Sequence, residues 1–233
     1  MLGTLAQRIA NLAFGGGCYL CRGAARGVLC AACDADLPRL AGPACPRCAL
    51  PSRDGALCGR CLARPPAYDA TVAALAYAFP ADVLVQGLKF RGELALAPLL
   101  GQALAARLPR GARVDFILPV PLSAVRLRER GFNQALEIAR SLAAATGCRL
   151  APQLAERSRE TPPQVDLPLD ERARNVRGAF SCTQALEHAE IAVVDDVMTT
   201  GATLDELAAT LKRAGAARVV NWVVARTPPP ADA

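Results

Sequence analysis

The sequence is poor in histidine, in lysine and in aromatic side chains. A single histidine occurs among 233 residues, and aromatic residues make up 4% of the chain. Catalytic triads that use a histidine base are therefore disfavoured, and no GxSxG nucleophile elbow is present. The low aromatic content also argues against a protein that holds single-stranded nucleic acid mainly by stacking its bases. Lysine occurs only at Lys89 and Lys212, which makes Lys89 conspicuous as a residue of either the site or the surface.

Long apolar runs are absent as well. No stretch of about 18 uncharged apolar residues occurs, which is the length that a membrane helix requires. The first residues lack a basic start followed by a solid apolar block, so a secretory signal is not expected. We therefore predict a cytoplasmic protein without membrane insertion. Apolar residues make up 52% of the chain, enough for a core, and the net charge of +6 suits contact with phosphates.

Cysteine, by contrast, is concentrated in one part of the chain, because eight of the ten cysteines lie between residues 18 and 61. A CxxC turn points two thiolates at one metal ion, and two such turns complete a tetrahedral site that suits zinc. The spacing of the pairs predicts two consecutive four-cysteine sites with structural zinc. The four pairs are Cys18/Cys21, Cys30/Cys33, Cys45/Cys48 and Cys58/Cys61.

Other interpretations of the cysteine block remain open from the sequence. An interleaved pairing of the CxxC turns would also give two tetrahedral sites, and an iron–sulfur cluster would use the same ligands. Disulfides are disfavoured in a cytoplasmic protein, where thiols stay reduced. The block is also basic, so sequence-independent contact with nucleic acid through its arginines is a further interpretation.

From about residue 67 onward, strand-like and helix-like segments alternate, which predicts an α/β domain with a parallel sheet and helices on both faces. We expect four domains or segments: an N-terminal helical segment (1–16), a double zinc ribbon (17–66), the α/β domain (67–227) and a disordered tail (228–233). The polar, proline-rich stretch 151–180 is expected to form a long loop or flap. Strands are expected within 68–79 (one strand or a hairpin), 114–122, 190–197 and 218–226, and helices within 93–108, 133–147 and 203–215.

The most informative stretch is IAVVDDVMTTGATLDEL (191–207). A buried strand that ends in Asp195 and Asp196 places two acids at the carboxyl edge of a parallel sheet, where ligands bind. The small residues that follow lead into a helix, whose N-terminal N–H groups form a cradle for an anion. Acids beside such a cradle suit ribose hydroxyls or Mg²⁺. The stretch thus predicts a sugar-phosphate site of the kind that 5-phosphoribosyl 1-pyrophosphate (PRPP) fits. The cradle residues are Thr199, Thr200, Gly201, Ala202 and Thr203.

The same stretch, VVDDVMTTGATL (193–204), resembles the signature of type I phosphoribosyltransferases. The chain as a whole resembles the ComF/ComFC family of competence-associated proteins, in the family's order and over nearly its whole length. The resemblance implies a type I phosphoribosyltransferase-like sheet behind a double zinc ribbon, and a link to natural competence and DNA uptake. The matching pieces besides the signature are the double cysteine block, LKFRGE (88–93), LPVPLSAVRLRERGFNQA (118–135) and TPPQ...L...ERARNVRGAF (161–180).

The resemblance also implies roles for individual residues. Asp195 and Asp196 are implied as the catalytic acids that hold the ribose diol and Mg²⁺, beside a 5′-phosphate loop at 199–203. The implied pyrophosphate loop contains Val120, Pro121 and Leu122, next to a basic clamp of Arg126 and Arg130. The implied flap contains Gln164, Arg172, Asn175 and Arg177. The arginines of clamp and flap are also compatible with solvated basic surface.

Neither the residues nor the resemblance supplies an acceptor for a phosphoribosyl transfer. The leading hypothesis is a PRPP- and Mg²⁺-binding phosphoribosyltransferase of unknown acceptor. The alternative is a non-catalytic competence protein that handles single-stranded DNA with its zinc module and basic surface, together with other competence machinery. In that case the PRPP loop would be retained as a ligand sensor or a relic.

Overall fold

The computed structural model describes residues 16–160 and 171–228, so the predicted N-terminal helical segment and the tail beyond residue 228 lie outside the described residues. Two short 3-10 helices, η1 (Arg53–Gly55) and η2 (Pro152–Leu154), accompany the regular elements. The strands are β1 (Ala70–Ala76), β2 (Phe116–Pro119), β3 (Arg149–Leu150), β4 (Ala155–Arg157), β5 (Phe180–Cys182), β6 (Glu190–Met198) and β7 (Arg218–Arg226). The helices are α2 (Ala31–Ala35), α3 (Gly59–Ala63), α4 (Ala81–Arg91), α5 (Leu96–Ala105), α6 (Ala124–Arg130), α7 (Gln134–Thr146), α8 (Glu171–Val176) and α9 (Ala202–Arg213).

Five strands form a parallel sheet in the order β1-β7-β6-β2-β3. From β2 the chain adds β3 on one side, and then crosses to β6 on the other side. The order therefore reverses between β2 and β6, and the crevice at the carboxyl ends of two such strands is where open α/β sheets bind ligands. Pro119 of β2 pairs with Val194 of β6, so the loop after β2 and the acid pair share this edge.

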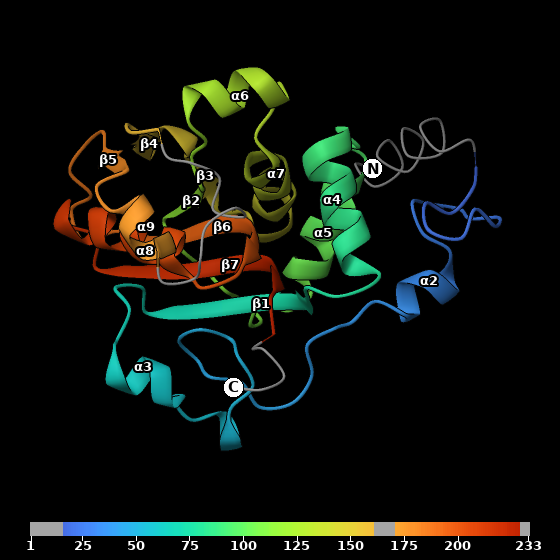
Figure 1. The fold of residues 1–233 in the computed structure, drawn as a ribbon, viewed down its shortest axis with the longest axis horizontal. Coiled ribbons are helices and arrows are strands. Elements are labelled where there is room, and N and C mark those ends of the chain that lie inside the picture. The colour runs from blue at the N-terminus through green and yellow to red at the C-terminus, as the bar shows by residue number, and fades with distance from the viewer. Residues whose placement is uncertain (1–15, 161–170, 229–233) are drawn as a thin grey trace.

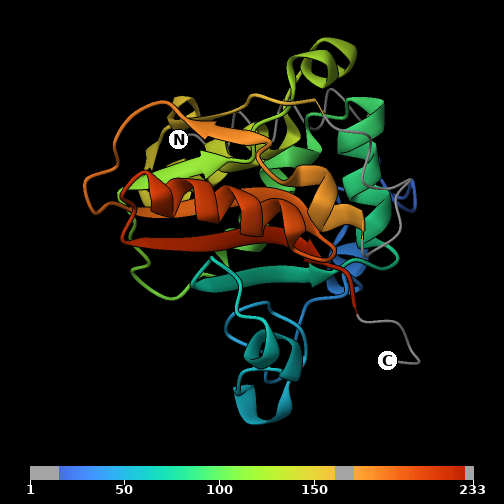
Figure 2. The same cartoon turned by 60° about the vertical axis from the view of Figure 1, so that its left-hand side comes forward.

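Helices cover both faces of the sheet, as its buried strands require. In β6, Ala192 and Val194 pack with α4, α5 and α7, whereas Ile191 and Val193 pack with α9. Successive side chains of a strand point to opposite faces, so β6 contributes to two cores at once. Figure 2 shows α9 in front of the sheet and the helices α5 and α7 behind it. The predicted fold class, a parallel α/β sheet with helices on both faces behind a cysteine-rich module, is confirmed.

The cysteine-rich module forms two lobes, which we call the first ribbon (residues 17–36) and the second ribbon (residues 43–64). The first ribbon, with α2, lies beside α4, and the second, with α3, lies beyond β1 at the edge of the sheet (Figure 1). The segment between them covers the outer edge of β1, since Leu40 N–H donates to Ala74 O (3.0 Å) and Ala76 N–H donates to Pro38 O (2.8 Å). This contact leaves less of the edge strand exposed.

One expectation about secondary structure was wrong, and the helix α4 was missed. The stretch 151–180 is not one long loop, because it contains η2, β4, α8 and β5, with 161–170 outside the described residues. Leu154, Val176 and Phe180 of this stretch are buried and give these short elements a core. Helix α4 was not predicted, because β-branched Val83 and Val85 and the central Gly87 disfavour a helix locally. Tertiary contacts made by the buried residues of α4 outweigh that propensity. Residues 68–79 contain the single strand β1 and no hairpin.

Candidate functional site

The acid pair lies near the end of β6. Residues 191–194 before it are fully buried, which anchors the strand, and Asp196 itself is only 3% exposed. Asp195 is partly buried. Each carboxylate accepts a hydrogen bond from the next backbone amide in the chain, Asp196 N–H for Asp195 and Val197 N–H for Asp196, both at 2.9 Å. These bonds hold both carboxylates close to the strand.

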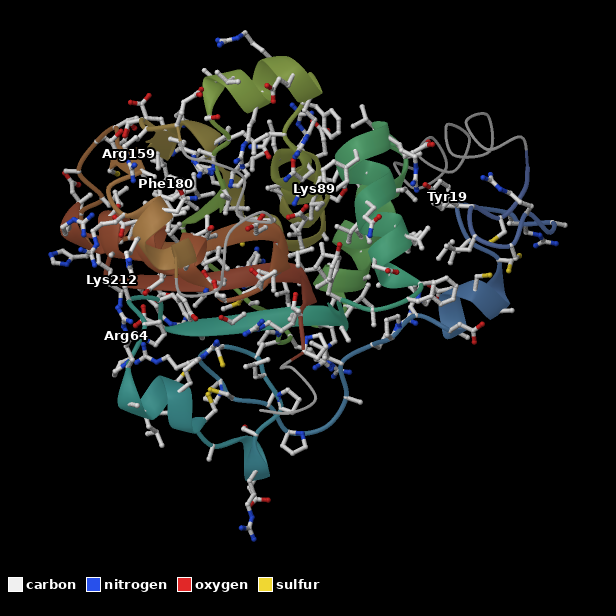
Figure 3. All side chains as sticks on the ribbon, in the orientation of Figure 1. Tyr19, Arg64, Lys89, Arg159, Phe180 and Lys212 are labelled. Carbon is white, nitrogen blue, oxygen red and sulfur yellow. The ribbon has the colours of Figure 1, made fainter. Side chains whose placement is uncertain are left out.

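Lys89 is the cationic partner of the acid pair. It lies in the last turn of α4, and its Nζ is 3.3 Å from Asp196 Oδ2. Figure 3 shows Lys89 on the side of α4 that faces the sheet. Asp196 Oδ2 is buried and accepts no hydrogen bond from the described residues, so this ion pair is its electrostatic compensation. An oxygen in that state is available to a further cation or a hydroxyl donor.

The two carboxyls of the pair differ in acidity. Burial raises the pKa of Asp195 well above its ordinary value, and the neighbouring charge of Asp196 raises it further. Burial also acts on Asp196, but the positive charge of Lys89 outweighs it and lowers its pKa. The pKa of Lys89 is raised, first by Asp196. The pair therefore offers one strongly ionised carboxylate and one that holds a proton readily, and a divalent cation can take the place of that proton.

The loop after β6 turns sharply into α9. Gly201 has a φ of 86°, and a Cβ at this position would lie 2.7 Å from Met198 Cε and 3.0 Å from Tyr68 Oη. Both observations require glycine. Thr200 Oγ1 accepts a hydrogen bond from Ala202 N–H at 3.3 Å, which helps to order the turn. The N-terminus of the 12-residue helix α9 points its first N–H groups out of this turn, and this favours an anion.

The loop after β2 and helix α6 form the opposite wall. Val120 N–H donates to Val194 O (2.9 Å), and Asn133 Nδ2 donates to Val120 O (3.0 Å), so the loop is held from both sides. Ser123 caps α6 by accepting from Arg126 N–H at 3.4 Å. Arg130, in the last turn, donates to the side chain of Gln134. Two guanidinium groups thus lie on the wall that faces the acid pair.

These elements enclose a cleft of about 630 Å³, which is within the range of small-molecule sites, roughly 300–1,000 Å³. Pro121, Thr200, Gly201 and Ala202 belong to the surrounding loops but do not line the cleft. The predicted site residues that line it are Asp195, Asp196, Thr199 and Thr203 from one side and Val120, Leu122, Arg126 and Arg130 from the other.

The predicted flap residues do not line the cleft in the described part of the chain. Gln164 and the side chain of Arg172 lie outside the described residues. Asn175 is half-buried and Arg177 is exposed. Their carbonyl oxygens accept hydrogen bonds from Arg159 Nη2 at 3.0 and 2.6 Å. The flap roles of these four residues therefore stay predictions.

Six further residues line the cleft that sequence reasoning did not assign to it: Tyr77, Phe90, Glu129, Gln134, Arg157 and Val197. Arg157 lies on β4, inside the stretch expected to be a loop. Phe90 follows Lys89 and is 67% exposed, with the guanidinium of Arg130 5.7 Å from its ring centre. The sequence offered one signal for this group, the lysine and aromatic ring of the LKFRGE motif.

The eight cysteines form two sets, residues 18, 21, 30 and 33 and residues 45, 48, 58 and 61, and the Sγ atoms of each set lie within 4.8 Å of one another. The Sγ atoms of Cys21 and Cys30 are 3.8 Å apart, and those of Cys48 and Cys58 are 3.6 Å apart. Tetrahedral zinc with bonds of about 2.3 Å requires about 3.8 Å between its sulfurs, whereas a disulfide requires about 2.05 Å. The two sets fit two structural zinc sites with consecutive pairing, and the interleaved alternative is excluded.

In each set, one thiol has a lowered pKa for the same reason. Burial raises the pKa of Cys18, but backbone N–H groups of the ribbon outweigh it and hold the pKa at about 6. Cys45 is the equivalent residue of the second set, and the same balance brings its pKa to about 6. A thiol that ionises below neutral pH is a ready metal ligand.

None of the helices in residues 16–160 and 171–228 combines the length and apolar character that crossing a bilayer requires.

Known proteins share both parts of this architecture. A family model described as a double zinc ribbon domain matches residues 9–62. DNA utilization protein YhgH of Salmonella typhimurium is 38% identical over 220 residues, which is 90% of this chain and 96% of that protein. Its namesake in Escherichia coli (strain K12) is 36% identical over the same shares. Competence protein F of Haemophilus influenzae is 31% identical over 222 residues, again 90% of this chain and 96% of that protein.

One solved structure aligns with part of the chain. It is described as the allosteric regulatory enzyme of purine biosynthesis and is 22% identical, with a TM-score of 0.37. The alignment covers 55% of this chain and 25% of that enzyme.

Proposed function

The chain belongs to the ComF family, with DNA utilization protein YhgH and competence protein F, and we propose that its cleft binds PRPP together with Mg²⁺. The observation that carries the proposal is one sheet edge that presents Asp195, Asp196 and the N-terminus of α9 to a single cleft. PRPP combines a ribose diol, a 5′-phosphate and a pyrophosphate. Each of these groups has a chemically matched partner around the cleft.

The 5′-phosphate is assigned to the loop 199–203. Backbone N–H groups at a helix N-terminus bind phosphate, and the hydroxyls of Thr199 and Thr203, which line the cleft, can donate further hydrogen bonds. No cationic side chain is needed there, since the helix dipole supplies the positive potential. The acids next to this loop are then left for groups that donate hydrogen bonds or carry positive charge.

The ribose diol and Mg²⁺ are assigned to the acid pair. Carboxylate oxygens are the ligands that Mg²⁺ prefers, and the buried Asp196 Oδ2 has no hydrogen bond from the described residues. Lys89, which neutralises Asp196 before a ligand arrives, can then turn its ammonium group toward the pyrophosphate. Arg126 and Arg130 on the facing wall suit the other oxygens of the pyrophosphate, because guanidinium groups bind such oxygens with paired donors.

The reaction class that this arrangement suits is phosphoribosyl transfer. The bond between the anomeric carbon and the pyrophosphate oxygen breaks, and a bond from that carbon to a nitrogen of the acceptor forms. Pyrophosphate leaves with the bonding electron pair, and the acceptor nitrogen loses its proton to water. When bound, Mg²⁺ neutralises charge on the leaving group. The residues of the chain position the ribose, bind the leaving group and require no covalent intermediate.

The first test is calorimetry with PRPP and Mg²⁺. We expect the wild type to bind and the Asp195→Asn/Asp196→Asn double variant not to bind. Glu190→Gln is the matched control, because Glu190 lies at the other end of β6 and pairs with exposed Arg218 at 3.2 Å. A wild type that shows no heat of binding, or a double variant that binds as the wild type does, would refute the proposal. Zinc content and circular dichroism establish that each variant is folded.

The alternative function, handling of single-stranded DNA, rests on a different observation. The ring of Phe90 is exposed at the rim of the cleft between Lys89 and Arg130, and such a combination can stack a base and bind its phosphate. The names of the relatives, DNA utilization protein and competence protein, also favour a function in DNA handling. This function is compatible with PRPP binding, because the ring lies at the rim and the acid pair lies deeper.

Fluorescence anisotropy with a labelled oligonucleotide tests the alternative. Phe90→Ala is expected to weaken binding by roughly 1–3 kcal/mol, the contribution of one stacked base. Phe79→Ala is the control, since Phe79 is 77% exposed but does not line the cleft. Affinity must also fall steeply as salt rises if phosphates contribute. Equal effects of the two substitutions, or no salt dependence, would exclude this mode of binding.

A further inference from the structure

Arg226, the last residue of β7, is buried and lies between the second ribbon and the loop that follows β6. Its side chain is only 2% exposed. Nε donates to the carbonyl oxygen of Cys48 at 2.8 Å, and Nη1 donates to the carbonyl oxygen of Met198, also at 2.8 Å. Nη1 further donates to the carbonyl of Thr199, the first residue of the phosphate loop. One guanidinium group therefore joins a cysteine of the second zinc set to the start of the loop.

The position of Arg226 follows from the sheet register. Met198 pairs with Arg226 at the ends of the parallel strands β6 and β7, so the side chain emerges where the phosphate loop begins. A guanidinium has its donors in a rigid planar fork, and this geometry lets Nε and Nη1 bond in two directions at once. A lysine ammonium at the same place could not bond both the ribbon and the loop in this way.

A buried guanidinium also requires negative charge nearby. In the described part of the chain, no carboxylate forms an ion pair with Arg226. Four thiolates around Zn²⁺ carry roughly two net negative charges, and Cys48, whose carbonyl Arg226 bonds, belongs to that set. With zinc bound, the second site would therefore supply negative charge beside the buried Arg226.

A second contact connects the same two regions. Tyr68 is 3% exposed and packs in one core cluster with Cys48 and Cys61. Its hydroxyl lies against Gly201, so close that a Cβ there would come within 3.0 Å. The backbone N–H of Ala67 donates to Asp205 Oδ1 in the first turn of α9 at 2.6 Å. The segment that follows the second ribbon, with Ala67 and Tyr68, thus contacts both the loop and the first turn of α9.

From these contacts we infer that Arg226 is a positioning residue through which zinc in the second ribbon orders the phosphate loop 199–203. The second ribbon is then part of the ligand site as well as a structural element. The inference rests on the proposed function only where ligand affinity is concerned. The order of the loop is a property of the protein alone and can be measured without a ligand.

Hydrogen exchange of the backbone amides in 199–203 is the first measurement. Arg226→Met removes the donors and keeps similar volume, and we expect exchange in this loop to rise about tenfold or more, with no change in α7. Arg226→Lys is expected to restore part of the protection, because it retains the charge. Arg218→Met is the matched control at the exposed start of the same strand. No change in the loop, or an equal rise in α7, would overturn the inference.

The metal side of the inference is tested by removing one ligand from each set. Cys58→Ser is expected to increase exchange in 199–203 and to reduce the bound zinc to one ion. Cys21→Ser is expected to lose one zinc without changing this loop. If both variants affect the loop equally, the coupling is not specific to the second ribbon. If Arg226→Met does not fold, withdrawal of zinc from the wild type by a chelator, followed by the same exchange measurement, replaces it.

Calorimetry with PRPP and Mg²⁺ on the same proteins separates the two proposals. Arg226→Met with both zinc ions bound is expected to bind roughly tenfold more weakly than the wild type, an effect of the size of one charge-assisted hydrogen bond. Unchanged affinity would refute the positioning role. If the wild type itself does not bind PRPP, the proposed function fails, and the exchange data still decide whether Arg226 orders the loop.

Discussion

The two ribbons use nearly the same cysteine spacing but lie in very different surroundings. In the second ribbon Cys45 and Cys48 are at most 1% exposed and belong to the core that α9 and β6 build. In the first ribbon Cys21 is exposed, and the contact with the domain is made by Tyr19, which packs against α4 (Figure 3), together with the partly buried Leu20, Val28 and Leu29. The same local motif can therefore form part of a domain core or an attachment at its surface.

Each ribbon also supports a different part of the candidate site. The first ribbon contacts α4, the helix that carries Lys89, because Tyr19 Oη accepts a hydrogen bond from Arg91 Nη2 at 2.6 Å. The second ribbon contacts the phosphate loop through Arg226 and Tyr68. Damage to the first ribbon should therefore act on the side of the cleft that holds Lys89, and damage to the second should act on the side of the loop 199–203.

The largest expected difference is between loss of a buried and loss of an exposed metal ligand. Cys45→Ser should lower the free energy of unfolding by more than about 4 kcal/mol, because three thiolates would stay in a core without a complete metal site. Cys21→Ser should leave the α/β domain folded and remove one zinc. Zinc analysis and urea unfolding measure both. Equal destabilisation by the two substitutions would contradict the distinction between the ribbons.

A smaller effect is expected where the first ribbon meets α4. A Cβ at Gly87 would lie 2.3 Å from Tyr19 Oη and 2.8 Å from Leu96 Cδ1. Gly87→Ala should therefore cost about 1–3 kcal/mol through overpacking and move the first ribbon away from α4. Gly59→Ala, in the second ribbon, has no atom within 4 Å of the new Cβ and should change stability by less than about 0.5 kcal/mol. Thermal unfolding of the two variants measures both changes in stability. A Gly87→Ala variant as stable as the wild type would disprove the tight contact.

Ligand affinity should depend on pH because of the acid pair, Asp195 and Asp196. This pair lies between the two parts of the cleft that the ribbons contact. Asp195 has a raised pKa, from burial first and then from Asp196, while Lys89 opposes the shift. Only the ionised carboxylate binds Mg²⁺, so affinity for PRPP and Mg²⁺ should fall as pH drops through this raised pKa, by up to about tenfold per pH unit. Calorimetry over a pH series measures the slope. A flat profile well above pH 4, the ordinary range of an aspartate, would contradict the raised pKa.

The smallest expected effect concerns one hydrogen bond of the first ribbon. Tyr19→Phe removes the acceptor of the Arg91 bond but keeps the ring in place, and should cost about 1 kcal/mol. Tyr68→Phe is the comparison in the second ribbon, where loss of the hydroxyl against Gly201 should alter exchange in 199–203. Urea unfolding and hydrogen exchange, used together, test whether each hydroxyl acts on its own side of the cleft.

Much of the architecture follows from local patterns. The run of apolar residues before Asp195 defines β6, the acid pair defines its ligand edge, and Gly201 marks the turn into α9. Each of these depends on residues close together in the chain, whose periodicity and conformational preferences act locally. The CxxC pairs are local in the same sense, because a turn of four residues fixes both sulfurs.

What the sequence by itself determined is therefore the α/β class, the two cysteine sets and the placement of the acids beside the N-terminus of a helix. Only the tertiary structure decided that Lys89 contacts Asp196, that Phe90 and Arg157 border the same cleft, and that Arg226 joins the second ribbon to the phosphate loop. The partners in these contacts are far apart in the chain. Burial and strand register create such contacts, and no local pattern specifies them.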